Sequence, residues 1–224
     1  MTGPVAESVE LTAGDHPDLR TRARDAILAG ITTGSLSAGV IYSVPLLAEQ
    51  LQMSATPVRE ALLGLADDGL VEPVKNRGFR VSPITDKALD EICEIRELLE
   101  VPATVAAATL ITDDDIQRLA DLATDIHKFA EAQDMVGYLS ADREFHMLLL
   151  NAGENEALVA LVGKLRDLTR LFNIQNLARA GELTPSADEH LEMVELLRSR
   201  QAKQLGALMK KHIRHTRESW AAQR

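Results

Sequence analysis

The segment from Ser54 to Leu70 constrains the fold of this chain more than any other, because one helix there separates an apolar face from a polar tip. It reads SATPVREALLGLADDGL. Apolar residues that can face a core recur at helical spacing, namely Val58, Ala61, Leu62 and Leu65. Thr56 and Arg59 lie near the beginning of the same helix and point in another direction. The segment therefore predicts an amphipathic helix that presents polar side chains at its N-terminal end.

The segments on either side extend this helix into a recognisable motif. Before it, Ser43 can cap a short helix whose inner face is apolar, comprising Val44, Leu47, Ala48 and Leu51. After it, residues 71–82 have the pattern of a hairpin with a basic tip. Two short helices followed by a basic hairpin are typical of a winged helix-turn-helix, which places its second helix in the major groove of DNA.

A further helix and a strand are predicted ahead of this motif. The helix begins at Leu19 and ends at the Thr32-Thr-Gly34 run, and its apolar stripe consists of Ala23, Ala26, Ile27 and Gly30. Val40–Tyr42 is a strand candidate. Residues 1–17 hold no Lys or Arg and no apolar stretch, so we expect a disordered acidic tail and not a secretory signal. The winged domain is expected to span residues 18–83.

From Thr85 onward the pattern is helical and no strand signal returns. Six helices are predicted, over residues 86–109, 113–131, 134–151, 155–179, 186–199 and 201–222. Gly181 and Pro185 mark the break before the fifth of them. The fold class is therefore mainly α, with an antiparallel six-helix bundle over residues 84–224. Such a bundle can hold a ligand between its helices.

Composition narrows the class of protein further. Of the 224 residues, 46% are hydrophobic and only 3% aromatic, which favours packed helices over a sheet sandwich. No apolar run approaches the ~18 residues needed to span a bilayer, and the single cysteine, Cys93, cannot form an internal disulfide. Both features suit a cytoplasmic protein without membrane contact.

The net charge of −10 argues mildly against nucleic-acid binding, because phosphate contacts need local positive charge. Two local clusters weaken this objection. The basic residues concerned are Arg20, Arg22 and Arg24 in the first helix and Lys75, Arg77 and Arg80 in the hairpin. A local patch, and not the net charge, governs docking on DNA.

Three stretches of the N-terminal half together resemble the DNA-binding domain of GntR-family transcription regulators. They are Thr56-Pro-Val-Arg-Glu-Ala-Leu62, Asp68-Gly-Leu-Val71 and Arg77-Gly-Phe-Arg-Val81. The helical half resembles the FCD effector domain of the FadR group, and its six helices suggest the VanR-like branch. The resemblance covers residues 19–220 and is more specific than any single motif.

The resemblance implies particular DNA contacts. Arg59 is expected to read a base, because an arginine can donate to both acceptors of guanine, worth about 1–3 kcal/mol of discrimination. The alternative for Arg59 is a surface salt bridge with Glu60 or Asp67. Ser54 and Thr56 are expected to contact phosphates, and Ser54 is also a candidate helix cap.

Arg77 and Gly78 lie at the predicted wing tip, where the resemblance implies an approach to the minor groove or the DNA backbone. Glycine allows a tight turn and a close approach, although an ordinary hairpin turn is the alternative. The family usually carries arginine directly after the capping residue, whereas this chain has Ala55. Its operator is therefore expected to differ from that of typical members.

A candidate metal site lies in the helical half. Asp142 and His146 are four residues apart and share one helical face, while His190 and His212 lie on the fifth and sixth helices. Taken alone, each histidine is more often structural, and an Asp–His pair at this spacing commonly faces solvent. The resemblance implies that all four are ligands of a divalent transition metal such as Zn, Ni, Mn or Fe. His215, one turn after His212, is a competing candidate.

Two residues are candidates for contact with an effector. Arg96 matches an arginine of the first FCD helix that can hold a carboxylate, and the alternative is an intrahelical bridge to Glu100. Asn173, on the fourth helix of this half, is a candidate for lining the pocket.

The expected function is a ligand-responsive transcription regulator, with repression released by the effector. It would bind a palindromic double-stranded operator as a homodimer, joined through the first and fourth helices of the helical half. The effector is expected to be a small organic acid bound beside the metal. The alternatives are a sensor that needs no metal, for example of an acyl-CoA, and a metal-dependent hydrolase.

Overall fold

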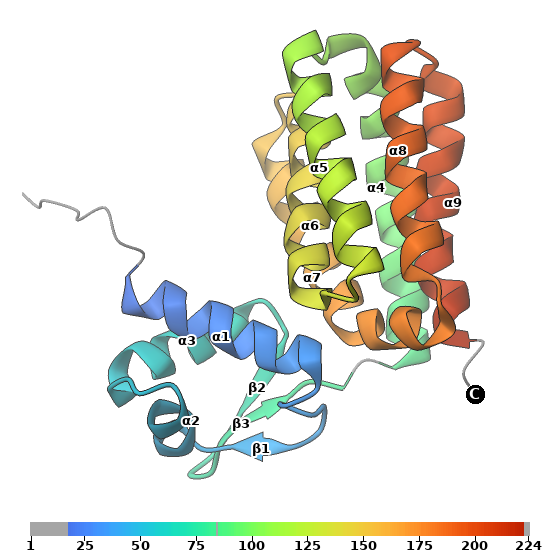
Figure 1. The fold of residues 1–224 in the computed structure, drawn as a ribbon. Helices are drawn as coiled ribbons and strands as arrows, with labels where there is room; N and C mark the ends of the chain where they lie inside the picture. Colours follow the sequence, from blue (N-terminus) through green and yellow to red (C-terminus); the bar gives the residue numbers. More distant parts are fainter. Residues whose placement is uncertain (1–17, 84, 222–224) are drawn as a thin grey trace, which may run out of the picture.

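The computed structural model describes residues 18–83 and 85–221, apart from some side chains within 170–180 and 216–221. The predicted tail at residues 1–17 lies outside the described residues. The N-terminal elements are α1 (Leu19–Thr33), β1 (Ile41–Tyr42), α2 (Val44–Gln50), α3 (Ala55–Asp67), β2 (Val71–Val74) and β3 (Gly78–Val81) (Figure 1). The predicted order of helices, strand and hairpin is therefore present.

Local signals explain where these helices begin and end. The carboxylate of Asp18 accepts a hydrogen bond at the start of α1, and the hydroxyl of Ser43 does so at the start of α2. Gly34 ends α1 with φ 80°, and Gly69 follows α3 with φ 78°. Ser54 occupies the N-cap of α3, but its side chain makes no capping hydrogen bond, so that part of the prediction was wrong. Its hydroxyl is left for another partner.

The three strands form one antiparallel sheet in the order β1-β3-β2, with β2 and β3 as the predicted hairpin. The apolar face of α3 packs into the core of this domain, as its spacing predicts. Its buried residues include Val58, Ala61, Leu62 and Leu65, which pack with Ala23 and Ile27 of α1 and with Phe79 of β3.

The helical half contains six helices within the described residues. They are α4 (Asp86–Leu110), α5 (Asp113–Glu131), α6 (Met135–Asn151), α7 (Glu156–Ala180), α8 (Leu183–Arg198) and α9 (Ala202–Ala221). α8 begins at Leu183 and not at residue 186 as predicted. The prediction took Pro185 as a break, but this proline lies in the first turn of the helix. Proline is tolerated there, since a first-turn N–H has no partner within the helix.

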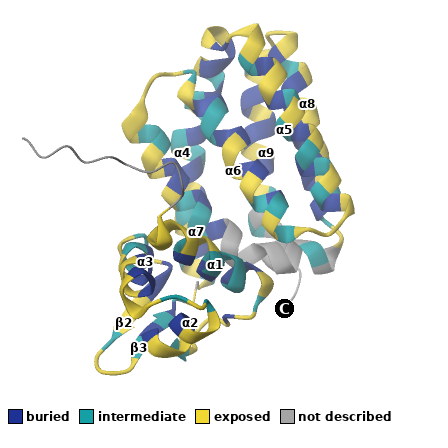
Figure 2. Ribbon diagram, turned by 60° about the vertical axis from the view of Figure 1, so that its left-hand side comes forward, coloured by how far each residue is buried: buried dark blue, intermediate teal, exposed yellow. Residues whose placement is uncertain are grey.

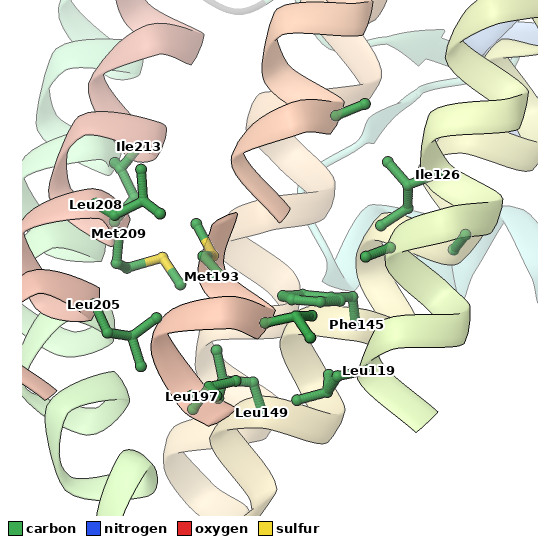
Figure 3. Close-up of a cluster of buried hydrophobic side chains, with 14 of the residues drawn as sticks. Leu119, Ile126, Phe145, Leu149, Met193, Leu197, Leu205, Leu208, Met209 and Ile213 are labelled. Carbon is green, nitrogen blue, oxygen red and sulfur yellow. The ribbon is translucent and has the colours of Figure 1, made fainter. Parts of the chain in front are cut away.

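A continuous apolar core holds the helical half together. α4 lies along α9, and α5 lies along both α6 and α8 (Figure 1). Side chains from α5, α6, α8 and α9 meet between the helices, among them Leu119, Phe145, Leu149, Met193 and Met209 (Figure 3). The chain is therefore mainly α, a winged helix-turn-helix joined to a helical bundle, as predicted. Within the described residues, no helix is both long enough and apolar enough to cross a membrane.

The two halves contact each other through α1, which packs against α6 and α7 (Figure 2). Leu139 and Leu168 of the bundle pack against the core of the N-terminal domain. Lys164 of α7 forms an ion pair of 3.1 Å with Asp68, which follows the last residue of α3. The N-terminal half is thus held directly against two of the bundle helices.

Gly78 is predicted to be essential to the wing. Its φ is 129°, and a Cβ added there would overlap the carbonyl oxygen of Tyr42. Gly39 has φ 80° but open space around a Cβ, so it is a matched control. We expect Gly78→Ala to lower the free energy of unfolding by about 3 kcal/mol or more, and Gly39→Ala by about 1–2 kcal/mol. Urea denaturation followed by circular dichroism measures both, and equal losses would contradict the steric argument.

Candidate metal centre and DNA-binding face

Four side chains from three helices converge in the bundle. Asp142 and His146 come from α6, His190 from α8 and His212 from α9, and each offers a ligand atom within 4.8 Å of the others. None of the four is more than 1% exposed. The ring of Phe145 packs edge-on against His146 and His190 and covers one side. The residues singled out in the sequence are therefore brought together in a water-excluded place.

The spacing of the donor atoms suits a single small cation. The Nε2 atoms of His146 and His190 are 3.2 Å apart, and Nε2 of His190 lies 3.1 Å from Oδ1 of Asp142. Two ligands at about 2.1 Å from one ion are separated by about 3.0 Å in octahedral and about 3.4 Å in tetrahedral geometry. A third separation, from His146 Nε2 to Asp142 Oδ1, is wider at 3.8 Å, and the ligand atom of His212 lies within 4.8 Å of the other three.

The outer nitrogens of two histidines have partners that fix the tautomer. Nδ1 of His190 lies 3.0 Å from the carbonyl oxygen of Ser186, and Nδ1 of His212 lies 2.8 Å from a carboxylate oxygen of Glu189. Since both partners are acceptors, each Nδ1 donates, and in a neutral ring each Nε2 then keeps a lone pair. Carboxylates and carbonyls commonly orient metal-binding histidines in this way.

Asp142 is oriented by a buried arginine. Arg166 of α7 donates from Nη2 to Oδ2 of Asp142 at 3.0 Å and from Nη1 to Glu100 at 2.7 Å. Arg166 and Glu100 are at most 1% exposed. The other oxygen of Asp142, Oδ1, is the one that lies near His190 and His146. Arg166 therefore stabilises the carboxylate charge and leaves one oxygen for the centre.

Arg96 is part of the same ionic network. Its Nε donates to Glu100 at 2.6 Å and its Nη1 to the hydroxyl of Thr169 at 3.0 Å, with no exposed surface. The intrahelical bridge, the alternative that the sequence left open, is thus the interaction present in this structure. Nη2 of Arg96 has no hydrogen-bond partner among the described residues. The side chain of Asn173 lies outside the described residues.

The electrostatics favour a neutral His146 and an ionised Glu189. Burial, with a further contribution from the nearby charge of Arg166, holds the pKa of His146 well below its usual range. Burial opposes ionisation of Glu189, but hydrogen bonds from His212 and His215 hold its pKa far below its usual range. A neutral His146 is in the protonation state in which an imidazole binds a metal ion.

Sequence reasoning missed the partners that orient these donors, namely Glu100, Arg166, Ser186 and Glu189. No second acid near the histidines was predicted, yet the Glu189 carboxylate contacts His212. His215, the competing candidate, lies 3.1 Å from Glu182 and 3.6 Å from Glu189, outside the four-residue cluster. Helical spacing could have found only the contact of His190 with the Ser186 carbonyl, four residues earlier in α8, because the contacts of Glu100, Arg166 and Glu189 join different helices.

The predicted DNA-contacting residues lie at the surface of the winged domain. Arg59, Ser54, Thr56 and Arg77 are exposed, and Gly78 is half-buried. Arg59 and the wing residues Arg77 and Gly78 line one hollow of about 570 Å³ between α3, the start of α2 and the hairpin. The structure thus places the candidate base-reading residue and the wing tip on a common face.

Part of the predicted positive charge is neutralised. Arg80 pairs with Glu72, directly opposite in the antiparallel register, at 2.7 Å. Arg24 of α1 pairs with Asp68 at 3.3 Å. The two basic clusters predicted from the sequence therefore carry less free positive charge than expected, because folding brings Asp68 next to Arg24 and Glu72 next to Arg80. Lys75 and Arg77 are the wing cations that line the hollow.

Comparisons with known proteins agree with this geometry. Residues 19–81 match the family described as bacterial regulatory proteins, gntR family, and residues 91–215 match the FCD domain. The chain is 31% identical over 173 residues to the Nta operon transcriptional regulator of Aminobacter aminovorans, covering 75% of this chain and 78% of that protein. It is 29% identical over 150 residues to the HTH-type transcriptional regulator McbR of Escherichia coli (strain K12), covering 67% and 68%.

A solved structure of E. coli McbR/YncC has a similar fold, with a TM-score of 0.76 at 24% identity, covering 89% of this chain and 95% of that one. The family and these relatives are transcriptional regulators and not enzymes, which excludes the hydrolase alternative. The chain belongs to the gntR family of bacterial regulatory proteins and is a DNA-binding transcriptional regulator with an FCD domain.

Proposed function

We propose that this regulator is a cytoplasmic repressor that carries a metal ion in its helical domain and releases its operator when a small organic acid binds. The observation that carries the proposal is the buried cluster of one carboxylate and three imidazoles. A DNA-binding domain over residues 18–83 and an effector domain over residues 84–224 divide the two tasks.

The donor set fits a divalent transition metal. Three neutral imidazoles and one carboxylate, from His146, His190, His212 and Asp142, suit Zn, Ni, Mn or Fe. The ionic network beside them is balanced, since Arg96 and Arg166 offset Glu100 and Asp142. A bound divalent cation would add two positive charges, and the Glu189 carboxylate beside His212 offsets only one of them, so the ion would attract an anion to its remaining coordination positions.

An organic acid is the effector class that this charge favours. A carboxylate would bind the metal ion as a further ligand, and Nη2 of Arg96 offers a donor that lacks a partner among the described residues. Asn173 remains a candidate for the same pocket. If the acid binds one relative arrangement of the two halves better than the other, operator affinity changes by the same coupling free energy.

A homodimer is favoured by an uncovered apolar face on α4. Ile95, Leu98 and Leu110 on this helix are 44%, 69% and 59% exposed, and Leu161 on α7 is 48% exposed. Ile95 and Leu98 are three residues apart and therefore lie on one side of α4, and exposed apolar side chains grouped in this way are typical of an interface. Two winged domains in such a dimer would bind the half-sites of a palindromic operator through Ser54, Thr56, Arg59, Arg77 and Gly78.

Purified protein that never met a metal-affinity column is expected to bind about one zinc ion per chain, and His146→Ala or His190→Ala to lose it. Glu189→Gln is expected to weaken zinc binding about 10–100-fold, because it alters the acceptor that orients His212. Elemental analysis and competition with a chelating dye measure these effects. His127→Ala is the control, since His127 pairs with Glu131 and Asp188 at a partly exposed place. No zinc in the wild type, or full zinc in His146→Ala, would exclude the site.

Arg59→Ala is expected to weaken specific operator binding by about 1–3 kcal/mol and to relax the preference at one base pair. Fluorescence anisotropy at fixed salt, with DNA from the regulator's own upstream region, measures the change. Lys87→Ala removes the same charge from an exposed position on α4 and is expected to have no such effect. Equal affinities for Arg59→Ala and the wild type would contradict the assignment.

Leu98→Glu is expected to shift the protein from dimer to monomer, because it places a charge in the uncovered face of α4. Leu191→Glu on α8, where the leucine is 37% exposed, is the control and should stay dimeric. Sedimentation velocity distinguishes the two species. A monomeric wild type would remove the homodimer from the proposal.

A further inference from the structure

A carboxylate between two cations ties the C-terminal end of the recognition helix α3 to the bundle. Asp68, which follows the last residue of α3, pairs through Oδ2 with Arg24 of α1 at 3.3 Å and through Oδ1 with Lys164 of α7 at 3.1 Å. An acid at this end of a helix is unfavourable by itself, because the carbonyl groups there carry partial negative charge. The two cations offset this cost, and one of them belongs to the other half of the protein.

An apolar contact accompanies the ion pair. Leu168, one turn after Lys164 on α7, packs against the core of the N-terminal half. Its Cδ2 lies 3.7 Å from the place that a Cβ on Gly69 would occupy, and Gly69 directly follows Asp68. Lys164 and Leu168 are four residues apart and therefore share one face of α7. This face holds the end of α3 through a charge and an aliphatic side chain together.

Another face of α7 is turned into the bundle. Arg166 is buried there and donates to Asp142 and Glu100. Thr169, also buried, accepts a hydrogen bond from Arg96. One helix therefore joins the buried ionic network of the bundle to the end of the recognition helix.

The contact with α7 leaves the DNA-binding face of the N-terminal half uncovered. Thr56 and Arg59 lie toward the other end of α3, and both are exposed. The helix rises about 18 Å from Thr56 to Asp68, at about 1.5 Å per residue. In Figure 2 the hairpin of β2 and β3 extends on the side away from the bundle. The docked arrangement is therefore compatible with DNA binding.

We propose that Lys164 of the bundle is a positioning residue for DNA binding. Through Asp68 it holds the recognition helix in the orientation at which two winged halves reach the half-sites of one operator, a step that rests on the proposed homodimer. Winged halves that are held in place beforehand lose less freedom on binding, so the operator complex is tighter. Lys164 acts through Asp68 and needs no contact with DNA.

Fluorescence anisotropy of the full-length protein with DNA from its own upstream region tests this role. Lys164→Met is expected to weaken binding about two- to fivefold, the range of a partly exposed ion pair. Lys164→Arg keeps the pair and should keep wild-type affinity, whereas Lys164→Glu places two acids together and should give a larger loss. Lys128→Met is the matched control, since Lys128 is a similarly exposed bundle lysine whose partner, Asp125, lies on the same helix.

Two measurements separate positioning from direct contact with DNA. In an Asp68→Asn background, Lys164→Met is expected to cause no further loss, because the partner through which Lys164 acts is already gone. The salt dependence of operator affinity should stay unchanged in Lys164→Met, whereas the loss of a phosphate contact would reduce its slope by about one. Asp67→Asn is the control for Asp68→Asn, since Asp67 is the exposed neighbouring acid.

Wild-type affinity in a dimeric Lys164→Met protein would overturn the proposal. A reduced salt slope would overturn it too, and so would an undiminished loss in the Asp68→Asn background. Sedimentation velocity of the wild type distinguishes these results from a failure of the proposed homodimer, because a monomer there would remove the dimer and the positioning role together.

Discussion

Arg166 bridges the carboxylates of Glu100 and Asp142, and the centre of the bundle depends on this interaction. All three side chains are buried, and an unpaired charge there would be strongly destabilising. Arg166 joins α7 to α4 and α6, so one guanidinium links three helices. Its hydrogen bond to Oδ2 of Asp142 also leaves Oδ1, the second oxygen, beside His190 and His146. The metal proposal therefore depends on a residue that is not itself a ligand.

The sequence predicted what depends on local order. The apolar spacing of α3 follows from helical periodicity, and so does the common face of Asp142 and His146. Placing His190 and His212 beside them came from the family resemblance, because no local rule brings α8 and α9 together with α6. The start of α8 was misplaced for a different reason: Pro185 was taken as a break, whereas the first turn of a helix accepts proline.

What the sequence could not predict are contacts between elements that meet only after folding. Glu100 and Arg166 are 66 positions apart, and His212 and Glu189 are 23 apart. From the sequence, Arg96 could either hold an effector carboxylate or form an intrahelical bridge to Glu100. Only the packing of α4 against α7 shows that it donates hydrogen bonds to both Glu100 and Thr169. Likewise, the pairing of Arg80 with Glu72 required the register of the hairpin. The sequence assigned three cations to the wing, but Glu72 neutralises one of them, Arg80, in the folded protein.

The arrangement of the two halves offers a short route from the proposed effector to DNA. α1 packs both on α3 and on the bundle helices that carry Asp142 and Arg166. A rigid element with two such contacts can transmit a change without any unfolding of the domain. Regulation then requires only a difference in ligand affinity between two positions of α1, which is the minimal condition for allosteric coupling.

The most direct test of the central claim is a crystal structure of the zinc-loaded protein with anomalous data collected at the zinc edge. The account predicts one strong peak per chain, bound by Asp142, His146, His190 and His212 at about 2.0–2.2 Å. Glu189 should lie outside the coordination sphere, on the far side of His212. A peak at His215 and Glu182, or no peak among the four residues, would contradict the account.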